Sequence, residues 1–199
     1  NKIEVGIGTQ GLLAETMAKD LPEVVAATTF FSLVNEGYFF NLKTSEDKII
    51  KGGGVFADER FFEMFSYNLI EGQATNVLKN KESAVISKTL AIKLFGSDEN
   101  VVGKSFEWEI IGKKSIVQVS GVFEDVPANS TQQFDFVLTK ASLFELVPNF
   151  KEWHNEGANT FLLLKKGTDV TTFNQKINGI VQKYSNSDRF TIFVRPYSS

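Results

Sequence analysis

The segment from Val24 to Ala57 constrains the fold most, because it contains three strand-like runs with no helix between them. β-Branched and aromatic residues dominate these runs, as is typical of strands. The runs and the turns that separate them are Val24–Val34, Asn35–Gly37, Tyr38–Leu42, Ser45–Asp47 and Ile49–Phe56. Short turns between consecutive strands favour antiparallel pairing over the regular strand–helix alternation of a parallel sheet.

Helix-like segments in the rest of the chain are few and short. Helical spacing predicts helices over Leu12–Lys19, Glu59–Phe65, Lys88–Phe95, Lys140–Leu146 and Val170–Tyr184. Further strands are predicted over 3–7, 84–86, 104–111, 115–123, 134–138, 160–164 and 190–194. We expect Thr9 to cap the first helix and Asp58 the second. Consecutive strands with scattered short helices predict an α+β fold.

The composition excludes several kinds of site. The chain has 21 basic and 24 acidic residues and a net charge of −3, which argues against a surface built to bind nucleic-acid phosphates. It has no cysteine, so neither disulfides nor thiolate metal sites can form. Its one histidine, His154, cannot form a multi-histidine metal site, and no G-x-S-x-G motif presents a nucleophile to it. We expect His154 to be a surface or packing residue.

Two glycine motifs resemble phosphate-binding loops but fail in their context. The segment Gly6–Gly11 matches G-x-G-x-x-G, but Pro22 ends the following helix early and antiparallel-looking β-structure comes next. Gly103–Ser105 matches the end of a P-loop, but Asp98 occupies the position of its first glycine, where a carboxylate would repel phosphate. We expect turns at both places. No catalytic, cofactor-binding or metal-binding residue is predicted, and the chain is not expected to be an enzyme.

Phenylalanine is frequent, with 19 residues, and adjacent pairs occur at Phe30–Phe31, Phe39–Phe40 and Phe61–Phe62. Neighbours on a strand point to opposite faces of the sheet, so each strand pair places one ring in the core and needs cover for the other. A partner protein or an apolar ligand could supply that cover. The candidate partner or cargo surface then consists of Phe30, Phe31, Phe39 and Phe40. The alternative is a sheet covered on both faces by the domain itself.

No segment has the length of a membrane span. The longest uncharged stretch around the phenylalanine pairs, Val24–Val34, is shorter than the about 20 apolar residues of a transmembrane helix. No signal peptide is visible at Asn1. We therefore expect either a cytoplasmic protein or a piece of a larger one. The polar stretch Glu71–Ser83 is the best candidate for a boundary between subdomains.

An ordered set of segments carries a resemblance to a known family. These segments are Leu21–Val24, Val55–Phe65, Leu69–Gly72, Ala84–Gly96, Val102–Lys104, Gly121–Ser130, Trp153–Leu164 and Arg195–Tyr197. Together they span most of the chain, and they resemble the MacB-like periplasmic core domain of FtsX- and MacB-type ABC transporter permeases. The segment Gly121–Ser130 is the most family-like.

The resemblance implies a two-subdomain organisation. A discontinuous Porter-like subdomain, of strands with packed helices, is expected over residues 1–78 and 131–199. A mainly β Sabre-like subdomain is expected as an insertion over residues 79–130. The polar stretch Glu71–Ser83 falls at the first of these junctions.

The resemblance also implies a function. Such domains lie on the periplasmic side of the bacterial inner membrane, looped between transmembrane helices of a permease. We expect a second permease copy and a cytoplasmic ATPase subunit as partners, and a periplasmic adaptor or cargo protein as a further one. The expected work is export or efflux of peptide, lipoprotein, drug or lipid cargo, or force transmission. The alternative is a periplasmic module that binds or senses a peptide or lipid and regulates a partner protein.

Overall fold

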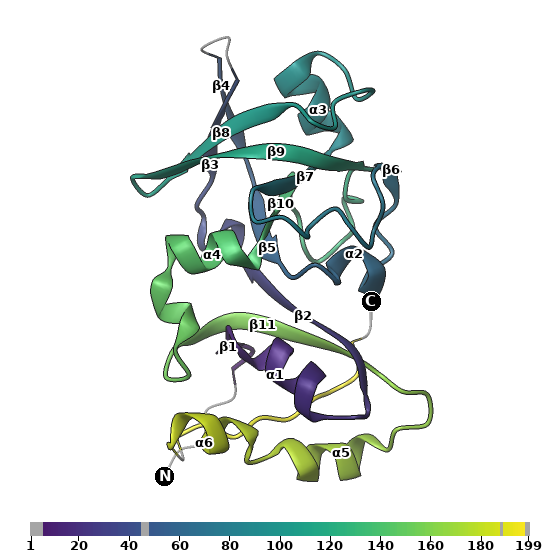
Figure 1. The fold of residues 1–199 in the computed structure, drawn as a ribbon, viewed down its shortest axis with the longest axis vertical. Helices are drawn as coiled ribbons and strands as arrows, with labels where there is room; N and C mark the ends of the chain where they lie inside the picture. Colours follow the sequence, from purple (N-terminus) through teal and green to yellow (C-terminus); the bar gives the residue numbers. More distant parts are fainter. Residues whose placement is uncertain (1–5, 45–47, 188, 198–199) are drawn as a thin grey trace.

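The computed structural model describes residues 6–44, 48–187 and 189–197 (Figure 1). Its strands are β1 (Thr9–Gln10), β2 (Val24–Ser32), β3 (Phe40–Lys43), β4 (Ile49–Gly52), β5 (Gly54–Ala57), β6 (Leu69–Glu71), β7 (Ser83–Ser87), β8 (Ser105–Ile110), β9 (Lys113–Phe123), β10 (Phe136–Thr139) and β11 (Glu156–Leu164). Its α-helices are α1 (Leu13–Asp20), α2 (Phe61–Met64), α3 (Lys88–Phe95), α4 (Lys140–Leu146), α5 (Val170–Ile177) and α6 (Ile180–Ser185). Two 3-10 helices are η1 (Val34–Glu36) and η2 (Pro148–Lys151).

The strands form one mixed sheet. They follow one another in the order β1-β11-β2-β5-β10-β7-β9-β8-β3-β4, and β6 pairs with β9. β10 is parallel to β5 and β9 is parallel to β7, whereas the other pairs of described strands are antiparallel. Because strands and helices do not alternate regularly along the chain, the predicted α+β class is confirmed.

Helices cover the sheet at its two ends. In Figure 1, α1, α5 and α6 lie below β2 and β11, and α3 lies at the opposite end beside β8 and β9. Three clusters of buried apolar side chains fill the interior, around Phe40 and Phe136, around Phe61, and around Met17 and Phe173. The third cluster is the one between α1, α5 and α6 and the sheet.

The predicted helices Leu12–Lys19, Lys88–Phe95 and Lys140–Leu146 are confirmed as α1, α3 and α4. Ser87 and Thr139 stand directly before α3 and α4, and each side-chain oxygen accepts a hydrogen bond from the backbone N–H three residues later, at 3.2 and 3.3 Å. This is an N-cap bond, which stabilises the first turn of a helix. Local sequence therefore determines where these two helices start.

The segment from Val24 to Ala57 contains four strands rather than three. The predicted strand Ile49–Phe56 is divided at Gly53, whose N–H donates to the carboxylate of Asp135 at 2.7 Å. Antiparallel pairing is confirmed between β3 and β4 and between β2 and β5, but β3 pairs on its other side with β8 and not with β2. The predicted turn Ser45–Asp47 and residues 3–5 of the first predicted strand lie outside the described residues.

Both predicted side-chain caps at the other helices are wrong. Thr9 lies in β1, where its Oγ1 donates to the carbonyl of Ala158 at 2.8 Å, and α1 begins after Leu12 without a side-chain cap. The second helix is shorter than predicted and its N-cap residue is Arg60, not Asp58. The carboxylate of Asp58 pairs with α4 instead.

The C-terminal region differs from prediction in two ways. The predicted helix Val170–Tyr184 is divided into α5 and α6 at residues 178–179. The predicted strand Phe190–Val194 is wrong, because this segment has no strand partner among the described residues. The side chain of Asn174 binds it instead: Nδ2 donates to the carbonyl of Val194 at 3.0 Å, and Oδ1 accepts from its N–H at 2.7 Å.

The predicted subdomain limits cross a continuous sheet. β3, within the predicted range 1–78, pairs with β8, within the predicted range 79–130. β10, within the predicted range 131–199, pairs with both β5 and β7. The Porter-like and Sabre-like limits therefore stay a prediction.

Replacing Gly54 with alanine is expected to destabilise the domain by about 2 kcal/mol. A Cβ at Gly54 would lie 2.4 Å from the ring of Phe136 and 2.7 Å from that of Phe40, and both rings are fully buried. Gly179→Ala is the control, because its Cβ would meet nothing within 4 Å. Urea unfolding should show a change within about 0.5 kcal/mol for the control. Equal effects of the two substitutions would contradict the packing around β5.

Candidate functional site

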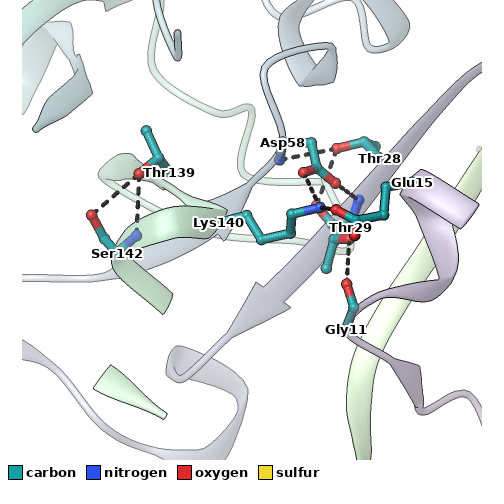
Figure 2. Close-up of polar contacts among 8 residues, drawn as sticks. All are labelled: Gly11, Glu15, Thr28, Thr29, Asp58, Thr139, Lys140 and Ser142. Carbon is teal, nitrogen blue, oxygen red and sulfur yellow. Dashed lines mark hydrogen bonds and ion pairs between the residues drawn. The ribbon is translucent and has the colours of Figure 1, made fainter. Parts of the chain in front are cut away.

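A partly buried ion-pair cluster joins α4 to α1 and to the end of β5 (Figure 2). Lys140, the first residue of α4, places its Nζ 2.7 Å from Oδ1 of Asp58 and 2.8 Å from Oε2 of Glu15. The side chains of Lys140 and Asp58 are 13% and 17% exposed, whereas that of Glu15 is 55% exposed. Lys140 and Asp58 therefore form the inner pair of the cluster, and Glu15 lies on its solvent side.

The register of two parallel strands brings the inner pair together. Thr139 of β10 lies opposite Ala57 of β5. The residues that follow are Lys140 and Asp58, and the carboxyl ends of parallel strands meet at the same edge of a sheet. No pattern within the sequence marks these two residues as a pair, since their proximity depends on this strand pairing.

Hydrogen bonds with β2 hold Asp58 in place through its carboxylate and through its backbone N–H. Its Oδ2 accepts from the backbone N–H of Thr29 at 2.6 Å, and the Asp58 N–H donates to Oγ1 of Thr28 at 3.3 Å. The Thr29 hydroxyl donates to the carbonyl of Gly11, just before α1, at 3.4 Å. Figure 2 shows Thr28 and Thr29 of β2 reaching Asp58, and Thr29 in turn reaching Gly11. Such hydrogen bonds offset the cost of burying a carboxylate.

Lys140 is held in its charged form. Burial has the largest single effect and by itself would lower the pKa of Lys140, but the charge of Asp58 and the hydrogen bonds to Asp58 and Glu15 outweigh it and leave that pKa raised. The Nζ atom also lies 5.7 Å from the centre of the Phe144 ring. A protonated, paired lysine is neither a base nor a nucleophile at neutral pH. Lys140 therefore joins structural elements rather than acting as a reactive group.

The structure places the four predicted surface phenylalanines differently. Phe30 and Phe40 are 2% and 0% exposed, so neither ring can meet a partner or cargo without unfolding. Phe31 is half-buried, with its ring centre 4.9 Å from that of Phe150. Phe39, at 52% exposure, is the one of the four with an exposed ring. Burial therefore restricts the predicted surface to Phe39, and its role as a surface stays a prediction.

Phe39 belongs to an uncovered face of the sheet, which we call the open face. The open face consists of Phe39 just before β3, of Ile111 in the turn between β8 and β9, and of outward residues of the four strands β3, β4, β8 and β9. These strand residues are Asn41, Lys43, Ile49, Lys51, Glu107, Glu109, Lys114 and Ile116. The opposite face of the same strands packs Phe40, Leu42, Trp108 and Val117 into the first core cluster. An antiparallel sheet can leave one face in water in this way.

A groove of about 620 Å³ separates α3 from β4 and the start of β8. Its apolar lining includes Ile50 and Phe95, and its basic lining consists of Lys48, Lys93 and Lys104. Among the residues that the structure describes, the lining includes no histidine and no carboxylate, so these residues present no general acid or base that titrates near neutral pH.

The glycine motifs and His154 have structural roles. A Cβ at Gly11 would lie 2.6 Å from the carbonyl of Phe150, so this glycine permits close packing. Gly103 lies in the predicted turn, with φ of +92° and its N–H donating to Val119 at 2.8 Å. His154 is exposed beside Trp153, as expected of a surface residue. Within residues 6–44, 48–187 and 189–197, no group of three or more histidine or acidic side chains could hold a metal ion.

No helix in the described part of the chain has the length and apolar run that a membrane crossing requires. The family model described as "MacB-like periplasmic core domain" matches residues 5–180 of the chain. No curated protein sequence matches the chain as a relative.

Three solved structures are similar in fold to this chain. A domain of a putative permease protein from Porphyromonas gingivalis has a TM-score of 0.74 and 22% identity, over 92% of this chain and 81% of that one. The periplasmic region of MacB from Actinobacillus actinomycetemcomitans has a TM-score of 0.63 and 14% identity, over 93% and 78%. The extracellular domain of the noncanonic ABC-type transporter YknZ from Gram-positive bacteria has a TM-score of 0.64 and 11% identity, over 96% and 91%.

Proposed function

Because the chain belongs to the family of MacB-like periplasmic core domains, we propose that it is the extracytoplasmic domain of an ABC transporter permease and carries ATP-driven motion to work outside the cytoplasm. The match of the family model to residues 5–180 is the observation on which this proposal rests. The cluster of Lys140, Asp58 and Glu15 is compatible with it, because its charges pair with one another and join elements of the fold.

The Lys140 cluster supports a mechanical role in this proposal. It connects α1 and β2, near the start of the chain, with the ends of β5 and β10 in the middle of the sheet. A force on α1 would therefore reach the sheet through the packing of α1 against β2, and the pair of Glu15 with Lys140 adds a second connection.

The partners in this proposal are a second permease copy, a cytoplasmic ATPase subunit, and a periplasmic adaptor or cargo protein. The work is export of peptide, lipoprotein, drug or lipid cargo, or mechanical regulation of a partner. A binding or sensing module is the second candidate, and the apolar side chains of the open face favour it. Phe39, Ile49, Ile111 and Ile116 are 52%, 59%, 65% and 63% exposed there.

Distance measurements between two permease copies test the proposal. We would reconstitute the permease that contains this domain with its ATPase in lipid vesicles and attach a spin label at Gln175→Cys, an exposed position on α5. The domain itself has no cysteine, so the label is unique within it. Transport coupling predicts that the label-to-label distances between copies change when ATP binds and return after hydrolysis.

The control is the same sample with an ATPase subunit that binds ATP but does not hydrolyse it. In this sample the label-to-label distance should stay at its ATP-bound value. A sensing module predicts a different result, with distances that respond to a peptide or lipid ligand and not to ATP. If the label-to-label distances do not change with ATP while the ATPase subunit hydrolyses it, the coupling proposal is ruled out.

A further inference from the structure

The open face carries apolar side chains that one copy of the domain leaves in water. Phe39, Ile49, Ile111 and Ile116 are each more than half exposed, although the other face of the same strands is fully packed. No helix or loop among the described residues covers these side chains. Exposed apolar side chains that share one face of a sheet are candidates for an interaction surface.

Ile111 adds a second, independent observation. The turn between β8 and β9 has positive φ at both of its residues, +49° for Ile111 and +69° for Gly112. Asn, Asp and Gly are the residues that favour such a hairpin turn, and a β-branched residue is strained there. The side chain of Ile111 is nevertheless 65% exposed and makes no compensating contact with the core. Folding of one copy therefore does not explain an isoleucine at this position.

Strand register places the residues of the open face in rows. In the central row, Asn41 of β3 lies opposite Glu109 of β8, with Lys51 and Lys114 at its two ends. In the next row, Lys43 lies opposite Glu107, with Ile49 and Ile116 at the ends. On the other side of the central row, continuation of the same register brings Phe39 opposite Ile111.

We propose that the open face packs against the open face of a second copy of this chain, about a two-fold axis parallel to β3 and β8. This inference deepens the proposed function by naming the surface that joins two permease copies. The axis places β3 of one copy over β8 of the other. Phe39 then meets Ile111, Asn41 meets Glu109, and Lys43 meets Glu107, each pair occurring twice.

The groups that would meet across the interface favour this axis over a two-fold axis that runs across the strands. A two-fold axis across the strands would place Lys43 against Phe39 and Glu107 against Ile111, burying charges against apolar groups. With the proposed axis, the flanking strands bring Ile49 to Ile116. The flanking pair Lys51 and Lys114 joins like charges, but both side chains are exposed at the rim, where solvent screens them.

A hollow on the open face fits this arrangement. Its volume is about 360 Å³ and its lining includes Lys43, Glu107 and Ile116. The proposed axis brings Lys43 and Ile49 of the second copy over this hollow. The contact therefore combines projecting side chains with a depression that can receive them.

The size of the face predicts weak self-association in solution. Four strands of about five residues cover roughly 19 Å by 17 Å, or roughly 300–500 Å² for each copy once side chains are included. Stable interfaces bury about 800 Å² for each partner. Two copies held in one membrane would associate through a high effective concentration. This supports a second copy, rather than a freely diffusing partner, as the occupant.

Mixed disulfide capture tests the inference. The chain has no cysteine, so Ile49→Cys and Ile116→Cys each introduce a single thiol. Under mild oxidation, an equimolar mixture of the two variants should give severalfold more disulfide-linked dimer than either variant alone, because the axis brings residue 49 to residue 116 and separates like residues. Ile92→Cys, which is 46% exposed on α3, is the control and should give only background linkage with either partner.

A further substitution, at Ile111, distinguishes an effect on association from an effect on folding. Ile111→Asn, added to both cysteine variants, should abolish the preference of the mixture while raising the midpoint of thermal unfolding, because asparagine tolerates positive φ. No preference in the starting mixture, or a preference that survives Ile111→Asn, would overturn the inference. ATP-dependent distances measured at Gln175 do not involve this face, so the proposed function can hold where this inference fails.

Discussion

Replacing Phe40 with alanine is expected to lower the free energy of unfolding by about 4 kcal/mol. The Phe40 side chain is 0% exposed, and its ring centre lies 5.1 Å from that of Phe136, 5.7 Å from that of Trp108 and 6.0 Å from that of Phe56. Truncation would remove these contacts and leave a cavity that the surrounding rigid strands cannot close. Urea unfolding followed by Trp fluorescence measures the loss.

The neighbouring residue supplies a matched control. Phe39 has the same side chain one position earlier, but it is 52% exposed on the open face. Phe39→Ala should therefore change the free energy of unfolding by less than about 0.5 kcal/mol at a concentration where the domain is monomeric. Similar losses for the two variants would mean that β3 does not present these rings to opposite faces.

The phenylalanine pairs show that the sequence predicts the direction of a strand side chain but not its burial. Alternation along a strand correctly predicts that Phe39 and Phe40 point to opposite faces. It cannot predict that Phe31 is covered, because the ring that covers it, Phe150, comes from a 3-10 helix far along the chain. The exposure of a strand residue depends on what packs over the strand, and that information is not local.

The same distinction explains which helices and strands could be predicted. α3 and α4 begin at Ser87 and Thr139 because each cap is a bond between residues three apart. The wrong strand Phe190–Val194 has the composition of a strand, but the Asn174 side chain takes the hydrogen bonds that a neighbouring strand would make. A helix or strand is predicted correctly where bonds between residues near in sequence determine it. The prediction fails where contacts between residues far apart in sequence determine the structure.

The Lys140 cluster lies beyond what sequence reasoning could predict. Glu15 and Lys140 are 125 residues apart, and Asp58 carries a sequence signal for a different role, the cap of the next helix. Only the parallel pairing of β5 with β10 brings Asp58 to Lys140. Family resemblance could predict the class of protein, but it provides no motif that identifies these three residues as the junction.

Replacing Lys140 with methionine is expected to destabilise the domain by about 3 kcal/mol. Methionine retains most of the apolar stem of lysine, so the substitution mainly removes the charge. Asp58, with a side chain 17% exposed, would keep its hydrogen bond from Thr29 but lose its counter-ion in a poorly solvated site. Glu15→Gln is the matched control and should cost less than about 1 kcal/mol, since Glu15 is 55% exposed and solvent screens its charge.

A double variant distinguishes a lost ion pair from lost packing. Asp58→Asn keeps an oxygen that can accept from Thr29, and in the Lys140→Met background it should recover about 1–2 kcal/mol by removing the unpaired carboxylate. A double variant that is less stable by the sum of its two single effects would show that Lys140 and Asp58 act independently.

The pH dependence of the Lys140→Met effect gives a second test with a defined sign. Because the surroundings raise the pKa of Lys140 in the folded domain, the pair contributes its full stability below the unfolded-state pKa of about 10.4. That contribution is lost as the pH rises through the higher folded-state pKa. The stability difference between wild type and Lys140→Met should therefore be constant near neutral pH and shrink in strongly alkaline solution. A difference that grows with alkaline pH would mean that burial, rather than pairing with Asp58, controls the charge of Lys140.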